Sequence, residues 1–186
     1  MPVGARLKRL LLWGPLLIFL LYAGLIAVRV LYPIDYIERL VHWSDVHRLD
    51  PALVGALVRA ESRYRADAVS SRGAIGLMQI MPETGLWIAE QLGLIGFDPS
   101  TLVDPDINLR LGTWYLANLL ERFDTPRRAL QAYNAGPSRA LEWLDHPEDV
   151  FPETETYVKR VLQSVFVYRA YIGAPWIPRA VPRLPL

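Results

Sequence analysis

Apolar residues form one unbroken run near the N-terminus and then recur at helical spacing through the rest of the chain. Residues 10–28 carry no charge, and a helix of that length spans roughly 28 Å, close to the hydrocarbon thickness of a bilayer. Beyond residue 32 the apolar positions recur three and four residues apart, between short breaks marked by proline or glycine. The pattern predicts a mainly α chain with one N-terminal transmembrane helix followed by a helical domain.

The charges around the apolar run set its expected orientation. Arg6, Lys8 and Arg9 precede the run and only Arg29 follows it closely, which favours a cytoplasmic N-terminus and an exported domain. A cleaved secretory signal is the alternative. The run is longer than the usual apolar region of roughly 7–15 residues, and no convincing small-x-small cleavage site precedes Arg29, so we favour a retained anchor.

Four predicted helix starts are marked by a capping residue followed by proline. Aspartate or threonine satisfies free backbone N–H groups, and proline at the first helical position lacks only a donor that would be unpaired. These starts are Asp50-Pro51, Asp98-Pro99, Asp104-Pro105 and Thr125-Pro126. We expect helices over 35–49, from 51 to about 62, and over 83–92, 105–123, 125–133, 138–144 and 154–172. The expected divisions are 1–31 (cytoplasmic tip and anchor), 32–173 (helical domain) and 174–186 (extended, proline-rich tail).

Glu61 stands near the end of the helix that begins at Pro51. Val54, Leu57 and Val58 precede it by seven, four and three residues and therefore share its helix face. A carboxyl group on an apolar face is withdrawn from water, which raises its pKa and suits proton donation near neutral pH. A surface or salt-bridged glutamate at the helix end is the alternative, and position alone leaves both open.

The amino-acid composition argues against several classes of function. The chain has no cysteine, which excludes disulfides, thiol chemistry and lipoprotein anchoring, and its three histidines lack metal-ligand spacing. We therefore expect no metal and no cofactor. Outside residues 1–31 there are 16 basic and 19 acidic residues, which argues against a nucleic-acid partner because phosphate binding requires a basic face.

A glycine-containing segment follows Glu61 and is expected to be irregular or β-like around residues 68–80. The motifs in and after it are Glu61-Ser62, Ala68-Val69-Ser70, Gly73-Ala74-Ile75-Gly76-Leu77-Met78-Gln79, Met81-Pro82-Glu83-Thr84, then Asn108, Gly112, Tyr115 and Leu116, then Ala132-Tyr133-Asn134-Ala135-Gly136-Pro137, and finally Glu153-Thr154 with Tyr157-Val158. In this order and spacing they resemble the soluble lytic transglycosylases, relatives of goose-type lysozyme, over about residues 36–172. One position departs from the pattern, because Glu155 stands where the family normally carries arginine.

The resemblance implies a lysozyme-like fold of about seven helices and a peptidoglycan lytic transglycosylase activity. Glycosidic cleavage usually uses two carboxyl groups, whereas this stretch offers one, since Asp67 is predicted to lie on the surface. In the family a single glutamate protonates the glycosidic oxygen between N-acetylmuramic acid and N-acetylglucosamine. It then takes the proton of the 6-hydroxyl as that oxygen closes a 1,6-anhydro ring, and the intramolecular nucleophile supplies proximity. The resemblance assigns both steps to Glu61.

The resemblance also implies a set of substrate-binding residues: Ser62, Ser70, Met78 and Gln79 along the saccharide groove, Tyr133 and Asn134 at the sugar beside Glu61, and Glu153 and Tyr157 on the opposite wall. Four of them have a structural alternative. Ser62 is equally suited to binding backbone at the helix end, Met78 to filling the core, Tyr133 to packing as a core aromatic, and Asn134 to capping a helix.

Other functions stay open. A lysozyme-like muramidase is the nearest alternative, followed by a non-catalytic peptidoglycan-binding or assembly protein and a purely structural membrane-protein partner. The expected partners are peptidoglycan strands, the lipid bilayer through residues 10–28, and possible cell-envelope proteins. The expected location is the bacterial inner membrane, crossed once, with the catalytic domain on the periplasmic or cell-wall side.

Overall fold

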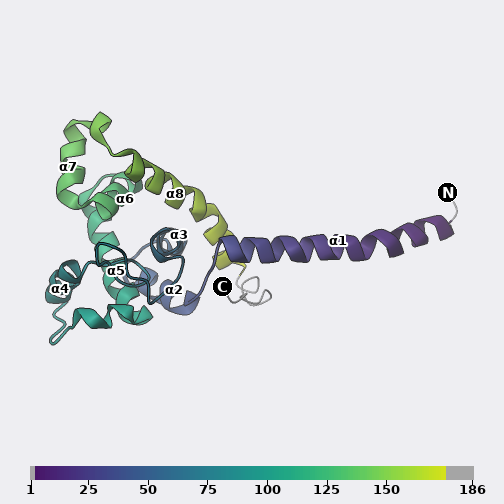
Figure 1. Ribbon diagram of the computed structural model, residues 1–186, viewed down its shortest axis with the longest axis horizontal. Helices are drawn as coiled ribbons and strands as arrows, with labels where there is room; N and C mark the ends of the chain where they lie inside the picture. The colour runs from purple at the N-terminus through teal and green to yellow at the C-terminus, as the bar shows by residue number, and fades with distance from the viewer. Residues whose placement is uncertain (1–2, 175–186) are drawn as a thin grey trace.

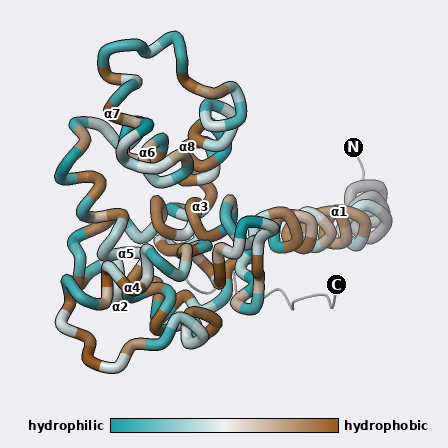
Figure 2. The backbone as a smooth tube through the Cα atoms, turned by 60° about the vertical axis from the view of Figure 1, so that its left-hand side comes forward, coloured by the Kyte–Doolittle hydropathy of each residue, from teal (hydrophilic) through white to brown (hydrophobic). Residues whose placement is uncertain are grey.

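A long N-terminal helix projects from a helical domain in this computed structural model, which describes residues 3–174, with side chains from Trp13 onward (Figure 1). Helix α1 (Val3–Leu31) contains a stretch from Trp13 to Leu31 that is long and apolar enough to cross a membrane, and none of that stretch is buried. In Figure 2 the part of α1 next to the domain is coloured mainly as hydrophobic. Beyond residue 174, the expected proline-rich tail lies outside the described residues.

Seven α-helices follow α1 in the described chain, so the prediction of a mainly α fold with about seven helices is confirmed. They are α2 (Ile37–Val46), α3 (Pro51–Ser62), α4 (Pro82–Gln91), α5 (Pro105–Arg122), α6 (Pro126–Ala135), α7 (Pro137–Asp145) and α8 (Pro152–Gly173), with short 3-10 helices η1 (Pro99–Val103) and η2 (Pro147–Asp149). The capped starts form as predicted. Asp50 Oδ1 accepts from the Ala52 N–H at 2.9 Å, and Asp104 Oδ1 accepts from the Asp106 N–H at 2.8 Å.

Helix α3 lies at the centre of the domain and packs along α8 (Figure 1). Residues 52–58 are all buried, so α3 is enclosed on almost every side rather than on one face. Val54, Leu57 and Val58, which share the Glu61 face, are fully buried. The burial of this stripe positions the last turn of α3, where Glu61 lies, at the edge of the core.

The segment after α3 folds back on itself through two isolated antiparallel bridges, Val69 with Ile75 and Ile75 with Ile80, as expected for a β-like segment. Asn108 of α5 fixes this segment: its Oδ1 accepts from the Met78 N–H at 2.7 Å, and its Nδ2 donates to the carbonyls of Ile75 and Leu102. Gly76 has φ +82°, and a Cβ there would lie 2.2 Å from Asn108 Nδ2. Only glycine fits this close approach.

Candidate active site

Glu61 occupies the last turn of α3 and is partly exposed, between the buried residues Val58 and Ser62. Burial of its carboxyl group raises its pKa to about 7, the direction expected from its helix face. The Tyr157 hydroxyl donates to Glu61 Oε1 at 2.5 Å and lowers that pKa somewhat, because the bond favours the charged form. Near neutral pH, Glu61 is therefore able to give and to take a proton.

Two tyrosines border Glu61. Tyr157 comes from α8 and is buried, and Tyr133 comes from α6 and donates its hydroxyl to the Met78 carbonyl at 2.8 Å. Burial, and then the charge of Glu61, raises the pKa of each phenol well above its usual value. Both phenols stay neutral and keep their hydrogen at physiological pH. The structure thus brings together Glu61, Tyr133 and Tyr157 from three helices.

Ser62 joins the end of α3 to the following segment. Its hydroxyl lies 2.8 Å from the Leu77 carbonyl and 3.2 Å from the Val58 carbonyl, and the residue is buried. These contacts occupy the hydroxyl with backbone acceptors. They favour the structural alternative for Ser62 over contact with a saccharide.

Met78 is fully buried, with its side chain against Gly112 of α5, where a Cβ would lie 2.4 Å from the Met78 sulfur. This placement favours a core role for the thioether. The Met78 carbonyl, by contrast, faces Tyr133 and sets the direction of the Tyr133 hydroxyl. Met78 therefore contributes to the site through its backbone.

Ser70 and Gln79 both hold the segment around residues 68–80. Ser70 Oγ accepts from the N–H groups of Arg72 and Ala74, at 3.3 and 3.0 Å. Gln79 has φ +49°, a left-handed conformation, and its amide nitrogen donates to the carbonyls of Ala68 and Gly76. Each side chain is half-buried, so each retains a face toward solvent.

Asn134 and Glu153 lie where α6 approaches the start of α8. Asn134 is exposed, and its Oδ1 accepts from the Thr154 hydroxyl at 2.8 Å. Glu153 is also exposed, and the described structure gives its carboxylate no hydrogen bond or ion pair, including none to Glu61 or its tyrosines. The sequence analysis missed the role of Thr154, although this buried residue lies beside Glu153 in the last motif.

Glu155, the departure from the family pattern, is accommodated by α6. Its carboxylate accepts from the Arg127 guanidinium and from Gln131 Nε2, the latter at 2.6 Å. The hydrogen bond from Arg127 is the main cause that lowers the pKa of Glu155. Glu155 is thus paired with an arginine of α6.

Four aromatic side chains, from Tyr133 to Trp114, follow one another in contact. Ring centroids lie 5.4 Å apart for Tyr133 and Tyr115, 6.2 Å for Tyr115 and Trp87, and 5.5 Å for Trp87 and Trp114. Trp87 is 40% exposed. This aromatic path was not predicted from the sequence, because its members come from three helices.

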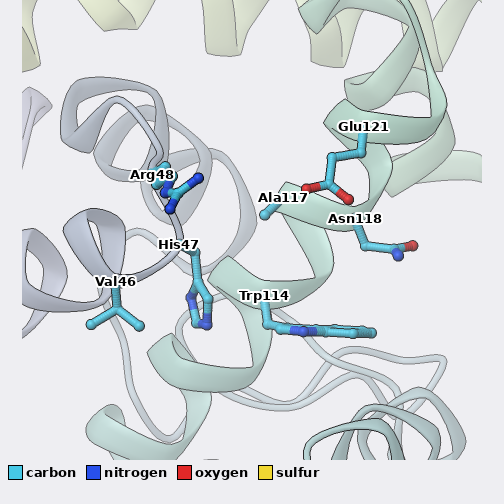
Figure 3. A pocket seen from close by; sticks show the side chains of 7 residues that line it. All are labelled: Val46, His47, Arg48, Trp114, Ala117, Asn118 and Glu121. Carbon is cyan, nitrogen blue, oxygen red and sulfur yellow. The ribbon is translucent and has the colours of Figure 1, made fainter.

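A cavity of about 320 Å³ lies between the end of α2 and α5, and none of the predicted site residues lines it (Figure 3). Its lining is Val46, His47, Arg48, Trp114, Ala117, Asn118 and Glu121. His47 Nδ1 lies 2.9 Å from Thr113 Oγ1, whose own hydrogen goes to the Leu109 carbonyl, so Nδ1 is the donor of that pair. Burial lowers the pKa of His47. This cavity is separate from the Glu61 site.

Residues 40–152 match the sequence profile described as the transglycosylase SLT domain. The chain is 32% identical over 155 residues to the soluble lytic murein transglycosylase of Escherichia coli K12, covering 76% of this chain and 24% of that protein. It is 31% identical over 134 residues to the membrane-bound lytic murein transglycosylase C of Actinobacillus pleuropneumoniae, covering 67% and 36%. The chain thus spans about a quarter to a third of the length of these relatives.

Solved structures agree with these relationships. The fold superposes on lytic transglycosylase Slt of Pseudomonas aeruginosa, solved as an inactive glutamate-to-glutamine mutant, with a TM-score of 0.73 and 32% identity, covering 79% of this chain and 26% of that one. The 70 kDa soluble lytic transglycosylase of Escherichia coli gives a TM-score of 0.71 at 32% identity, over 76% and 25%. The prediction of the fold is confirmed, and the chain belongs to the transglycosylase SLT domain family.

Proposed function

We propose that this chain is a peptidoglycan lytic transglycosylase that cleaves the β-1,4 bond between N-acetylmuramic acid and N-acetylglucosamine and leaves a 1,6-anhydro end. The observation that carries the proposal is Glu61, a partly exposed residue whose carboxyl group has a pKa of about 7 and accepts a hydrogen bond from a neutral phenol. The two relatives compared above are themselves named as lytic murein transglycosylases, and a glutamate-to-glutamine form of the Pseudomonas enzyme is described as inactive.

The reaction needs one group that acts twice. Neutral Glu61 gives its proton to the glycosidic oxygen as the bond from that oxygen to the muramic acid anomeric carbon breaks. The resulting carboxylate then takes the proton of the muramic acid 6-hydroxyl, whose oxygen bonds to the same carbon. Glu61 returns to its starting state and no water is consumed. Tyr157 stabilises the carboxylate between the two steps, because its hydroxyl donates to Oε1.

The surroundings of Glu61 favour this route over hydrolysis. Burial and the Tyr157 hydroxyl are what shift its pKa, with no contribution from a second carboxylate of the described chain. Asp67, the carboxylate nearest in sequence, is exposed. A hydrolase normally places a second carboxyl group to activate water or to attack the sugar. The internal 6-hydroxyl nucleophile removes that requirement.

Substrate binding is proposed for Tyr133, Tyr157, Asn134, Glu153, Gln79 and Ser70, and for Met78 through its backbone. Tyr133 and Tyr157 are the best placed, since both lie beside Glu61. Ser62 is retained as support for the end of α3. No part of the proposed reaction uses a metal or cofactor.

Digestion of purified sacculi with separation of the products by mass tests the proposal. We expect anhydromuramic ends, and a Glu61→Gln loss of roughly 10²–10⁴-fold. Asp67→Asn is the matched control and should retain activity. Abundant reducing muramic acid without anhydro ends would instead establish a muramidase. A Glu61→Gln protein that still binds sacculi and fully replaces the wild type in cells would favour a non-catalytic peptidoglycan-binding protein.

We further propose that α1 anchors the chain once in the bacterial inner membrane, with the domain on the periplasmic or cell-wall side. The apolar stretch from Trp13 to Leu31 supports this, as does the basic cluster before it. Intact mass of the protein extracted from membranes separates an anchor from a cleaved signal. The full-length mass is expected, and loss of about 30 N-terminal residues would contradict the anchor.

A further inference from the structure

The proposed anchor enters the domain without a flexible linker. Helix α1 ends at Leu31, and Ile34, only three residues later, is 3% exposed within the main hydrophobic core. Three residues reach at most about 10 Å even when fully extended. The end of α1 is therefore held against the domain (Figure 1).

Arg59 of α3 makes the first of two connections across this junction. Its Nε donates to the Leu31 carbonyl at 2.8 Å, and its guanidinium lies 4.2 Å from the centre of the Tyr32 ring. A second nitrogen donates to Ser164 Oγ of α8 at 3.2 Å. One side chain thus ties the last residue of α1 to the two central helices of the domain.

Tyr168 of α8 makes the second connection. It is fully buried, and its hydroxyl donates to the Pro33 carbonyl at 2.7 Å. Its ring meets the Tyr32 ring edge to face, with centroids 6.3 Å apart. From the other side, Arg29 of α1 donates to the Ile34 carbonyl at 3.0 Å. We call Arg29, Tyr32, Pro33, Arg59 and Tyr168 the juxtamembrane latch.

The juxtamembrane latch places the candidate active site close to the end of α1. Glu61 follows Arg59 by two residues, about 3 Å further along the axis of α3. The reach of the arginine side chain and the width of one helix put Glu61 on the order of 15 Å from Leu31. Leu31 is the last residue of the apolar stretch. When α1 crosses a bilayer, Glu61 works just outside the lipid headgroups.

The position of Glu61 close to the bilayer indicates which glycan strands it can reach. A glycan strand is polar and has no affinity for hydrocarbon, so it remains this close to a bilayer when one of its ends is attached to a lipid. We propose that Glu61 acts on glycan strands that are covalently attached at one end to a membrane lipid, and that it cuts near the lipid. The reaction that supplies this substrate is glycosyl polymerisation on a lipid carrier at the outer face of the inner membrane. The inference rests on the proposed activity and anchor.

The full chain reconstituted in vesicles of phosphatidylethanolamine and phosphatidylglycerol tests this inference. Two substrates of equal length are compared: strands attached by lipid to the same vesicles, and soluble strands. We expect lipid-attached strands to be cut at least tenfold faster, leaving lipid with a short, uniform stub. Equal rates of anhydro-end formation on both substrates would overturn the inference and leave the proposed activity standing. Absence of anhydro ends from both would overturn the proposed activity itself.

A spacer tests the role of the short junction. Twenty Gly/Ser residues inserted between Leu31 and Tyr32 add a coil of about 25 Å, so the stubs should lengthen and vary while cleavage of soluble strands is unchanged. The same insertion after Ile95, a fully exposed loop residue, is the control and should leave stub length unaltered. Stubs of wild-type length from the Leu31 insertion would overturn the inference.

A pair of conservative variants tests the latch itself. Tyr168→Phe removes the hydroxyl that binds the Pro33 carbonyl and should broaden the stub lengths. Thr113→Val removes a buried hydroxyl of α5, which binds the Leu109 carbonyl and has no contact with the latch, and should not. Equal distributions of stub length for the two variants would contradict a role of the juxtamembrane latch in positioning Glu61.

Discussion

The Tyr157 hydroxyl lies 2.5 Å from Oε1 of Glu61, although 96 residues separate the two in the chain. The contact joins α3 to α8, the helices that pack along each other through the domain core. It is the one hydrogen bond that the described structure gives to this carboxyl group. The proton affinity of Glu61 is therefore set jointly by burial, which raises it, and by this phenol, which lowers it.

We expect cleavage to fall as pH rises through about 7. The first step of the proposed reaction requires protonated Glu61, whose pKa is about 7, so kcat/KM for soluble glycan should drop roughly tenfold per pH unit on the alkaline side. A pH–rate profile measured between pH 5 and about 9 checks this. An alkaline limb that lies below pH 5.5 would contradict the assignment of Glu61 as the acid.

The same shift predicts a pH dependence of stability. The folded state holds the Glu61 proton up to about pH 7, whereas the unfolded chain releases it near 4.5, so folding binds a proton in that window. The free energy of unfolding should therefore fall as pH rises from 4.5 to 7, by about 3 kcal/mol in total. Glu61→Gln should lack this component. Denaturant titrations of both proteins at pH 5 and about 8 measure the difference, and parallel pH curves would refute it.

Tyr157→Phe should move the alkaline limb to higher pH and slow the reaction. Loss of the donor removes the influence that lowers the pKa of Glu61 and leaves the carboxylate unsupported, which costs about 10–100-fold in kcat. Tyr171→Phe is the control, because the buried Tyr171 hydroxyl has no partner in residues 13–174. Its pH profile should match that of the wild type. Identical limbs for Tyr157→Phe and the wild type would exclude a role for the phenol in tuning Glu61.

Helix starts were predictable because proline and a capping side chain act locally. The expected start at Pro51 and the observed one coincide, and Asp50 and Asp104 cap as predicted. The helix expected over 35–49 is shorter, Ile37–Val46, because Tyr36 and Arg48 adopt left-handed conformations that neither proline nor glycine announces. Local signals thus fix ends where the side chain itself caps, and miss ends that depend on tertiary packing.

The burial of the Glu61 carboxyl group was predictable from the sequence, whereas its hydrogen-bond partner was not. The apolar stripe before Glu61 indicated burial of the carboxyl group, and the burial is observed. The stripe carried no information about the Tyr157 hydroxyl, which arrives from a distant helix. Nor did it indicate that the Gln79 amide would turn back onto its own segment, since that depends on a left-handed backbone. Long-range partners require the packed structure.

Gly76→Ala should destabilise the domain by about 3 kcal/mol or more and abolish activity. A methyl group there would meet Asn108 Nδ2 at 2.2 Å and the Leu102 carbonyl at 2.3 Å, and it would also strain a backbone with φ +82°. Gly73→Ala is the matched control, with φ +85° and open space, so it should cost only about 1 kcal/mol. Thermal unfolding of both variants measures the two losses of stability. Equal losses would contradict the tight approach of Gly76 to Asn108.

Arg48→Gly should stabilise the protein by about 0.5–1 kcal/mol. Arg48 has φ +55° at the end of α2, where the Leu49 N–H donates to the Ser44 carbonyl at 2.8 Å. This is the closing turn that favours glycine. Arg39→Gly, the same change at an exposed position inside α2, should instead destabilise by about 1 kcal/mol. Chemical denaturation of the two variants should show shifts of opposite sign.

Gly112 affects the geometry of the candidate active site although it lies outside that site. The missing side chain leaves the room in which the Met78 thioether rests, and the Met78 carbonyl in turn orients the Tyr133 phenol. Any larger residue at position 112 would displace the backbone at Met78. The Tyr133 phenol would then turn away from the Glu61 carboxyl group. A glycine with no chemical role of its own thus helps to set the geometry of the candidate site.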